Sequence, residues 1–156
     1  MMKHLIAGYA SSTASDVSNL RDMMMEHLLS GDAAALERSL REMFARIPLK
    51  LHIPQEAYYH SLFLLWLNLL GFDVIGEMMT DKGIIDAVWT CEERVVVAEI
   101  KYSKKEGDCE KLLINAFKQI KDNRYYERYS GSGKGVALLA IAFAGKEITC
   151  KFEEYE

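Results

Sequence analysis

Apolar positions recur at helical spacing over the first part of the chain. Residues 16–29 and 33–47 both show this period, and Ser30-Gly31 separates them. Asp32 stands directly before the second segment, where a side chain that caps a helix is favoured. Two successive helices are therefore predicted.

A third helix is predicted over residues 54–71. Pro54 suits a first helical turn, and Gly71 suits a helix terminus. After His60 this segment is apolar on nearly every side, which is typical of a buried helix rather than a half-exposed one.

From residue 72 the pattern changes to short runs rich in β-branched residues. Five strands are predicted, over residues 72–78, 84–90, 94–102, 136–145 and 147–155. The last of them alternates polar and apolar positions like an edge strand, and a long helix over roughly 108–129 precedes the fourth. The order of helices, three hairpin-linked strands, a helix and two strands predicts an α/β domain whose mixed sheet is covered by helices.

Composition and charge narrow the class of protein. The chain has 156 residues, half of them hydrophobic, which is typical of one globular domain. A net charge of −4 argues against a polycation that coats nucleic acid without specificity, although residues 101–134 hold nine Lys/Arg against five Asp/Glu.

Cysteine usage and apolar run length bear on the compartment. Three cysteines without a CxxC pair, together with the absence of a secretory signal, predict a reduced, cytoplasmic setting. The longest apolar run, "LFLLWLNLLGF", is shorter than a membrane span, so no membrane association is predicted.

Two carboxylates interrupt the most apolar part of the chain. If the turn between the second and third strands is centred between Glu92 and Glu93, Asp86 lies directly opposite Glu99. Lys101 is two residues beyond Glu99 and shares its face of the sheet. The turn lacks the Gly or Asn of the favoured two-residue types, so a slip by one residue stays open.

Two buried carboxylates at this distance require a proton or a cation between them. Oxygen ligands with room for water suit Mg²⁺ or Mn²⁺, which could activate a water and hold a phosphate oxygen. Lys101 could orient that water, deprotonate it, or stabilise the charge of the transition state. The structural alternative is a plain salt bridge from Lys101 to Glu99 or Asp86.

Three further side chains have both a structural and a functional interpretation. Glu56 is either a first-turn helix acid, which the helix dipole favours, or part of the site. Gln119 belongs either to a solvated helix face or to the site. His60, one turn after Glu56, is either a core histidine or a residue that touches the site.

These elements in this order resemble the PD-(D/E)XK nuclease superfamily. The pattern is a helix Glu (Glu56), a strand Asp (Asp86), Glu99-Ile100-Lys101 on the next strand, then Gln119 and Tyr125 on the following helix. More narrowly, four stretches look like the nuclease-like domain often found C-terminal to an AAA-ATPase-like domain: "EAYYH", "GFDVIGEMMTDKGIIDAV", "VVVAEIKYS" and "AFKQIKDNRYYERYSGSGKGV". The similarity runs from about residue 45 to the C-terminus.

The resemblance implies a restriction-endonuclease-like core over residues 48–156, with residues 1–47 as a helical extension of the same single domain. It implies a Mg²⁺- or Mn²⁺-dependent DNA endonuclease in which Asp86, Glu99 and the Ile100 carbonyl bind the metal and Glu56 lies in its outer shell. Lys101 would serve the attacking water, and Gln119 and Tyr125 would position the lysine or a phosphate.

Nucleic-acid contacts are expected along the basic stretch that follows the third strand. The residues expected to make them are Lys104, Lys118, Lys121, Arg124 and Tyr125. Tyr125, Tyr126 and Tyr129 could stack on bases, and the alternative is that they pack the helix onto the sheet.

The sequence departs from the family pattern at two positions. Ile84 stands where relatives often have Arg, and Asn123 stands where Lys is frequent. The first departure puts one phosphate or structural contact in doubt. "SGSGKG" follows a helix and lacks the spacing of a nucleotide-binding loop, so nucleotide hydrolysis is not expected.

Two other functions stay open at this point. One is a nucleic-acid-binding or regulatory module of weak activity that needs a partner ATPase domain; the other is a structural α/β domain with a buried salt bridge. A homodimer is plausible because two sites cut both strands most simply.

Overall fold

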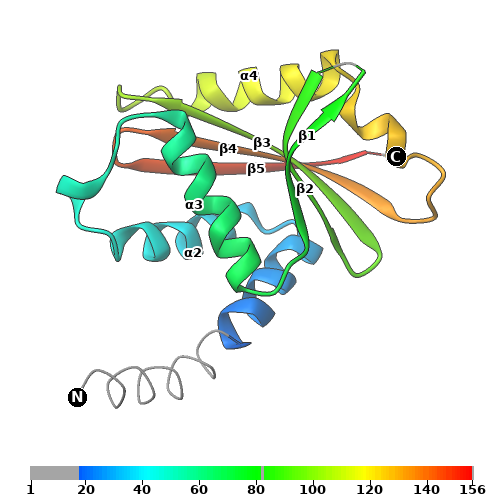
Figure 1. Ribbon diagram of the computed structural model, residues 1–156, viewed down its shortest axis with the longest axis horizontal. Helices are drawn as coiled ribbons and strands as arrows, with labels where there is room; N and C mark the ends of the chain where they lie inside the picture. The colour runs from blue at the N-terminus through cyan, green and yellow to red at the C-terminus, as the bar shows by residue number, and fades with distance from the viewer. Residues whose placement is uncertain (1–17, 82, 156) are drawn as a thin grey trace.

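The computed structural model describes residues 18–81 and 83–155, which fold around one mixed sheet (Figure 1). Its five strands lie in the order β1-β2-β3-β4-β5. Their bounds are β1 Val74–Thr80, β2 Gly83–Cys91, β3 Arg94–Ser103, β4 Gly135–Ala144 and β5 Glu147–Tyr155. The helices are α2 Ala33–Ala45, α3 Glu56–Leu69 and α4 Cys109–Asp122, with short 3-10 helices η1 Leu49–Leu51 and η2 Tyr125–Tyr129.

Strand direction follows from the connections between strands. Short turns join β1 to β2, β2 to β3 and β4 to β5, and each of these pairs is antiparallel. β3 and β4 are parallel, and α4 supplies the crossover that a parallel pair requires. The predicted α/β architecture with a mixed sheet is confirmed.

Helices cover both faces of the sheet (Figure 1). The helical segment 18–30, α2 and α3 share one apolar core with the sheet, and α4 shares the other. Met24 and Leu28 are fully buried in the first core, so the described part of the N-terminal extension packs onto the rest of the domain.

α2 covers the outer edge of β5. The Cys150 N–H donates to Glu37 Oε1 at 2.8 Å, and an Arg41 guanidinium N–H donates to the Ile148 carbonyl at 3.0 Å. These two side chains bond the edge backbone that no further strand pairs. The prediction that 147–155 is an edge strand is confirmed.

The expectation that the third helix is buried all round is wrong. α3 begins at Glu56, two residues after Pro54, and buries only the stripe Tyr59, Phe63 and Leu67. Leu65 is 49% exposed and Leu69 64% exposed, because α3 meets the sheet along one side and no described residue covers its other side. Among residues 18–81 and 83–155, no helix has the length and apolar character of a membrane span.

The predicted long helix 108–129 is also wrong at its C-terminal end. α4 ends at Asp122, Arg124 takes a left-handed conformation (φ 51°), and the chain continues as η2. The reversal brings Tyr125 into the core at 3% exposure. There its hydroxyl accepts the Asn123 side-chain N–H at 3.1 Å. Burial of this ring is the physical reason why the helix cannot run straight on.

Candidate active site

The β2–β3 hairpin has the predicted register, but its ladder stops just before the two carboxylates. Cys91 pairs with Arg94 and Ala87 pairs with Ala98, which extrapolates to Asp86 opposite Glu99. Neither described ladder of β2 includes Asp86, although its neighbours Ile85 and Ala87 both pair with β1. The sheet is therefore interrupted at Asp86.

Side-chain direction shows the same interruption. Ile85 and Val88 both lie in the core beneath α4, although residues three apart on a regular strand face opposite sides of the sheet. Ala87 lies in the other core, with α3. The side chains of β2 therefore change faces of the sheet at Asp86. Glu77 is the β1 residue opposite Asp86 in the register, and it has a left-handed φ of 51°.

Beyond the Ala87–Ala98 pair, no described β2 residue is paired with β3, which leaves a gap beside Ile100. The Asp86 carboxylate fills this gap. Asp86 Oδ2 accepts the Ile100 N–H at 2.8 Å, in the place of a backbone carbonyl of β2. The Asp86 carbonyl instead points toward α3, where it lies 2.7 Å from His60 Nε2. Because a strand residue directs its N–H and C=O to the same side, the Ile100 carbonyl also faces the gap.

Glu99 is buried without a full set of partners. It is 1% exposed, and its Oε2 has no hydrogen-bond partner among the described residues. Burial first, and then the negative charge of Asp86, raise the pKa of Glu99 from the usual 4.5 to about 8, although Lys101 acts in the opposite direction.

Lys101 is held between two side chains. Its Nζ donates to Gln119 Oε1 at 2.6 Å and lies 3.4 Å from Glu99 Oε1. Gln119 comes from α4, which packs on the same face of the sheet as Glu99. The fold thus brings together Asp86, Glu99, Lys101 and Gln119 from three separate elements.

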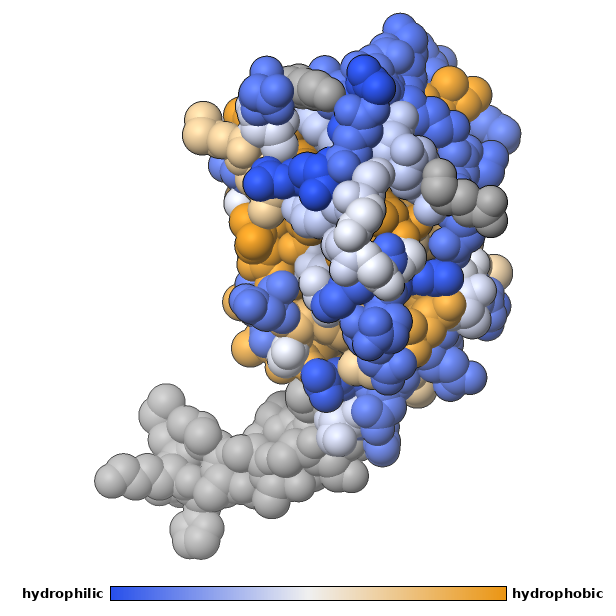
Figure 2. All heavy atoms as spheres, turned by 90° about the vertical axis from the view of Figure 1, so that its right-hand side faces the viewer, coloured by the Kyte–Doolittle hydropathy of each residue, from blue (hydrophilic) through white to orange (hydrophobic). Residues whose placement is uncertain are grey.

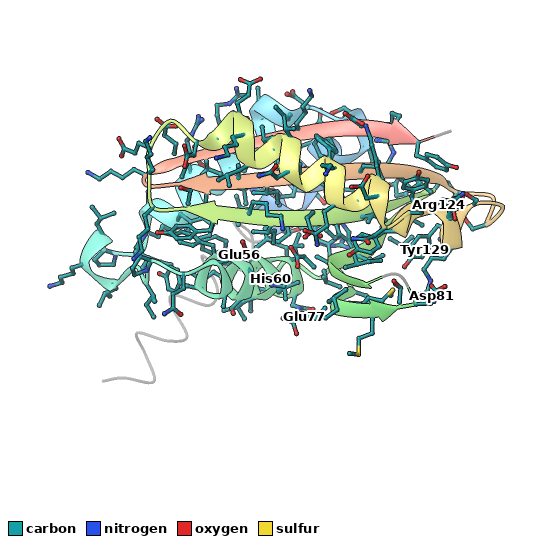
Figure 3. All side chains as sticks on the ribbon, turned by 90° about the horizontal axis from the view of Figure 1, so that it is seen from above. Glu56, His60, Glu77, Asp81, Arg124 and Tyr129 are labelled. Carbon is teal, nitrogen blue, oxygen red and sulfur yellow. The ribbon has the colours of Figure 1, made fainter. Side chains whose placement is uncertain are left out.

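Glu56 belongs to α3 rather than to the sheet. It is exposed in the first turn of α3, one turn before His60, and Figure 3 shows both residues on this helix. Among the described residues, no group of three or more His, Cys, Asp or Glu side chains is placed to hold a metal ion. The oxygen atoms that border the gap belong to the Asp86 and Glu99 carboxylates and to the Ile100 carbonyl.

The predicted nucleic-acid contacts are scattered around α4 and η2. Lys104 is exposed. The other three basic residues form ion pairs: Lys118 Nζ lies 3.7 Å from Asp122 Oδ2, Lys121 Nζ lies 2.6 Å from Glu153 Oε2, and Arg124 pairs with Glu127. Tyr125 is 3% exposed, so little of its ring is open to a base, although the residue lines the cleft described next. Tyr126 and Tyr129 are half-buried and pack beside the core under α4.

A cleft of about 600 Å³ lies where the tip of the β1–β2 hairpin meets η2. Arg124 and Arg128 line it, together with Asp81 and Asn123. Figure 2 looks onto this end of the molecule, whose upper part is mostly hydrophilic, and Figure 3 labels Asp81 and Arg124 there. The opposite charges in the lining make the cleft polar rather than strongly basic.

Sequence reasoning did not find how His60 meets the site. The contact depends on the break in the ladder, and no local pattern predicts that break. The one available signal is the spacing of Glu56 and His60, which places both on the same side of a helix.

Comparison with known protein families gives a match over most of the chain. The model of the PD-(D/E)XK nuclease superfamily matches residues 54–153. The chain belongs to the PD-(D/E)XK nuclease superfamily. The resemblance drawn from the ordered motif is confirmed, and the mixed sheet with its helices is consistent with the restriction-endonuclease-like core of the superfamily.

The PD-(D/E)XK domain also matches a curated relative, an uncharacterized protein in the vnfD 5' region of Azotobacter chroococcum mcd 1. The two are 28% identical over 145 residues. The match covers 90% of this chain and 27% of the relative, so the chain spans about a quarter of that protein's length.

Proposed function

We propose that the domain is a metal-dependent nuclease that hydrolyses phosphodiester bonds of DNA, with Asp86, Glu99 and Lys101 as catalytic residues. One observation carries the proposal: the buried Glu99 has an unpartnered oxygen beside a second carboxylate and a lysine that an amide holds in place. A structural salt bridge does not need the second carboxylate, whose charge only opposes the ionisation of Glu99.

The donor set fits Mg²⁺ or Mn²⁺. A divalent cation between the carboxylates would give Glu99 Oε2 a partner and offset the repulsion from Asp86. Asp86, Glu99 and the Ile100 carbonyl would hold it, and Glu56 would act through water from α3. Such a cation supplies an activated water and stabilises negative charge on a phosphate oxygen.

Lys101 and Gln119 would act as a unit. With Nζ 2.6 Å from Gln119 Oε1 and 3.4 Å from Glu99 Oε1, the ammonium group has a restricted position beside the carboxylates. From there it orients the attacking water and stabilises the charge that develops on the phosphate.

The DNA backbone would follow exposed basic side chains beyond the site. Lys104 directly follows the end of β3, Lys118 and Lys121 lie on α4, and Arg124 comes two residues after α4 ends. Ile84, where relatives often have Arg, is 48% exposed near the tip of β2 and offers no charge. We assign the phosphate contact at this end of the molecule to Arg124 and Arg128, which line the adjacent cleft.

The experiment combines divalent-ion binding with cleavage on the same samples. Wild type, Glu99→Gln and Lys101→Met are titrated with Mn²⁺ in a calorimeter and incubated with supercoiled plasmid plus Mg²⁺ or Mn²⁺. Wild type should bind and nick, Glu99→Gln should do neither, and Lys101→Met should bind but not nick. Exposed Glu93→Gln is the matched control and should behave as wild type.

A second candidate function is a nucleic-acid-binding module that depends on a partner domain, such as an AAA-ATPase-like one. The short coverage of the relative, 27% of its length, favours it, because the longer protein has room for such a partner. Wild type that binds Mn²⁺ and plasmid without nicking would favour the module over the free-standing nuclease. Absence of Mn²⁺ binding would refute the metal mechanism in both.

A further inference from the structure

His60 contacts the Asp86 backbone at the point where the sheet is interrupted. Its Nε2 lies 2.7 Å from the Asp86 carbonyl oxygen. In a regular sheet this carbonyl would be bonded by a neighbouring strand, but neither described ladder of β2 includes Asp86. A partly buried carbonyl that has left its ladder needs another donor, and α3 provides it.

A glycine on β1 lies against α3 beside this contact. A Cβ built on Gly76 would lie 2.6 Å from Leu64 Cδ1, so the Leu64 side chain packs directly on the backbone of β1 here. Gly76 pairs with Ala87, the neighbour of Asp86, and Leu64 is one turn after His60. The close approach and the hydrogen bond are thus adjacent on both the helix and the sheet.

We propose that His60 is a positioning residue that fixes the turned Asp86 peptide and thereby directs the Asp86 carboxylate toward Ile100 and Glu99. The geometry supports this order of effects. The carbonyl and the carboxylate belong to the same residue, and one is held by His60 while the other accepts the Ile100 N–H at 2.8 Å. If the peptide returned to the ladder, the carboxylate would leave the gap.

The same contact links α3 to the candidate metal site. Glu56 and His60 lie on successive turns of α3, as Figure 3 shows. Helix α3 would place Glu56 in the outer coordination shell of the metal. Through His60 the same helix also holds the backbone of Asp86, a proposed direct ligand. This consequence for metal affinity rests on the proposed function, whereas the consequence for the Ile100 hydrogen bond does not.

The test compares His60→Gln, which keeps a donor near the Nε2 position, with His60→Leu, which keeps the bulk and removes the donor. His52→Leu is the matched control, because His52 Nε2 makes a similar contact with the Ile47 carbonyl at 3.0 Å away from the site. The first readout is hydrogen exchange of the Ile100 amide without divalent ions, measured relative to the Val96 amide in the intact part of the same strand pair.

In His60→Leu the Ile100 amide should exchange at least about tenfold faster relative to Val96, and Mn²⁺ should bind about tenfold or more weakly. His60→Gln should stay within about threefold of wild type in both readouts. His52→Leu should change global stability alone. If folded His60→Leu leaves the Ile100 exchange ratio unchanged, the proposal is overturned and His60 only fills space.

Two further arms keep the outcomes separate. If His60→Leu does not fold, His60→Ala takes its place, because it also removes the donor to the Asp86 carbonyl and should expose the Ile100 amide in the same way. If wild type binds no Mn²⁺, the proposed nuclease function fails. The exchange ratio of Ile100 then still decides whether His60 positions Asp86.

Discussion

Glu99→Gln should stabilise the metal-free protein, and the gain should grow with pH. The folded protein raises the pKa of Glu99 from 4.5 to about 8, first through burial and then through the charge of Asp86. Between these values the folded state holds a proton that the unfolded chain has released, so stability falls as pH rises through this window. At about 1.36 kcal/mol per pH unit, the loss is less than about 1 kcal/mol at pH 5 and about 4 kcal/mol at pH 8.

Glutamine isolates this effect because it has the shape of the protonated acid, can also donate a hydrogen bond and does not ionise. Urea denaturation of wild type and Glu99→Gln with a chelator at pH 5 and pH 8 measures the difference in free energy of unfolding. Exposed Glu93→Gln controls for general charge effects. Equal differences at the two pH values would refute the reasoning, since they would mean that Glu99 ionises in the folded state as easily as in the unfolded chain.

Three other predictions test separate parts of the molecule. Gln119→Leu should lower the plasmid nicking rate about 10- to 100-fold while calorimetric Mn²⁺ affinity stays within about threefold, because it frees Lys101 without touching the carboxylates. Arg124→Gly should raise the urea midpoint through relief of the left-handed φ of 51°, worth up to about 1 kcal/mol, and should weaken plasmid binding in a gel-shift assay; a lower midpoint would contradict it. Leu67→Ala should cost about 2–5 kcal/mol of unfolding free energy, because this side chain is almost fully buried on the core stripe of α3.

The order of helices and strands was predictable because apolar residues recur in each with the regular spacing of a helix or a strand. The strands read as apolar, β-branched runs, and the hairpin register follows from the position of Glu92 and Glu93 in the turn. The placement of Asp86, Glu99 and Lys101 on one face was predictable for the same reason, whereas Gln119 was indicated by the resemblance to the superfamily. Strand and helix periods decide which side chains share a face.

Two features were not predictable because they depend on tertiary packing. The composition of α3 indicates a buried helix, yet how much of it is covered depends on what packs against its far side. The residues after Asp122 continue a plausible helical pattern, yet the chain reverses because Tyr125 is buried against the Gly83 end of β2. Helix propensity depends only on neighbouring residues, so it does not include the free energy gained when Tyr125 is buried against another element.

The break at Asp86 explains why strand alternation locates the site but not its geometry. Strict alternation puts the Asp86 and Glu99 side chains on one face of a continuous ladder, where the β2 backbone would bond the Ile100 N–H. The ladder opens instead, and the Asp86 carboxylate takes the place of that backbone. The opening removes backbone bonds and buries a carboxylate of which one oxygen has no partner, so it lowers the stability of the metal-free fold. A local conflict of this kind persists where it serves binding or catalysis, which is why the least regular point of the sheet is the place to look for the ligand.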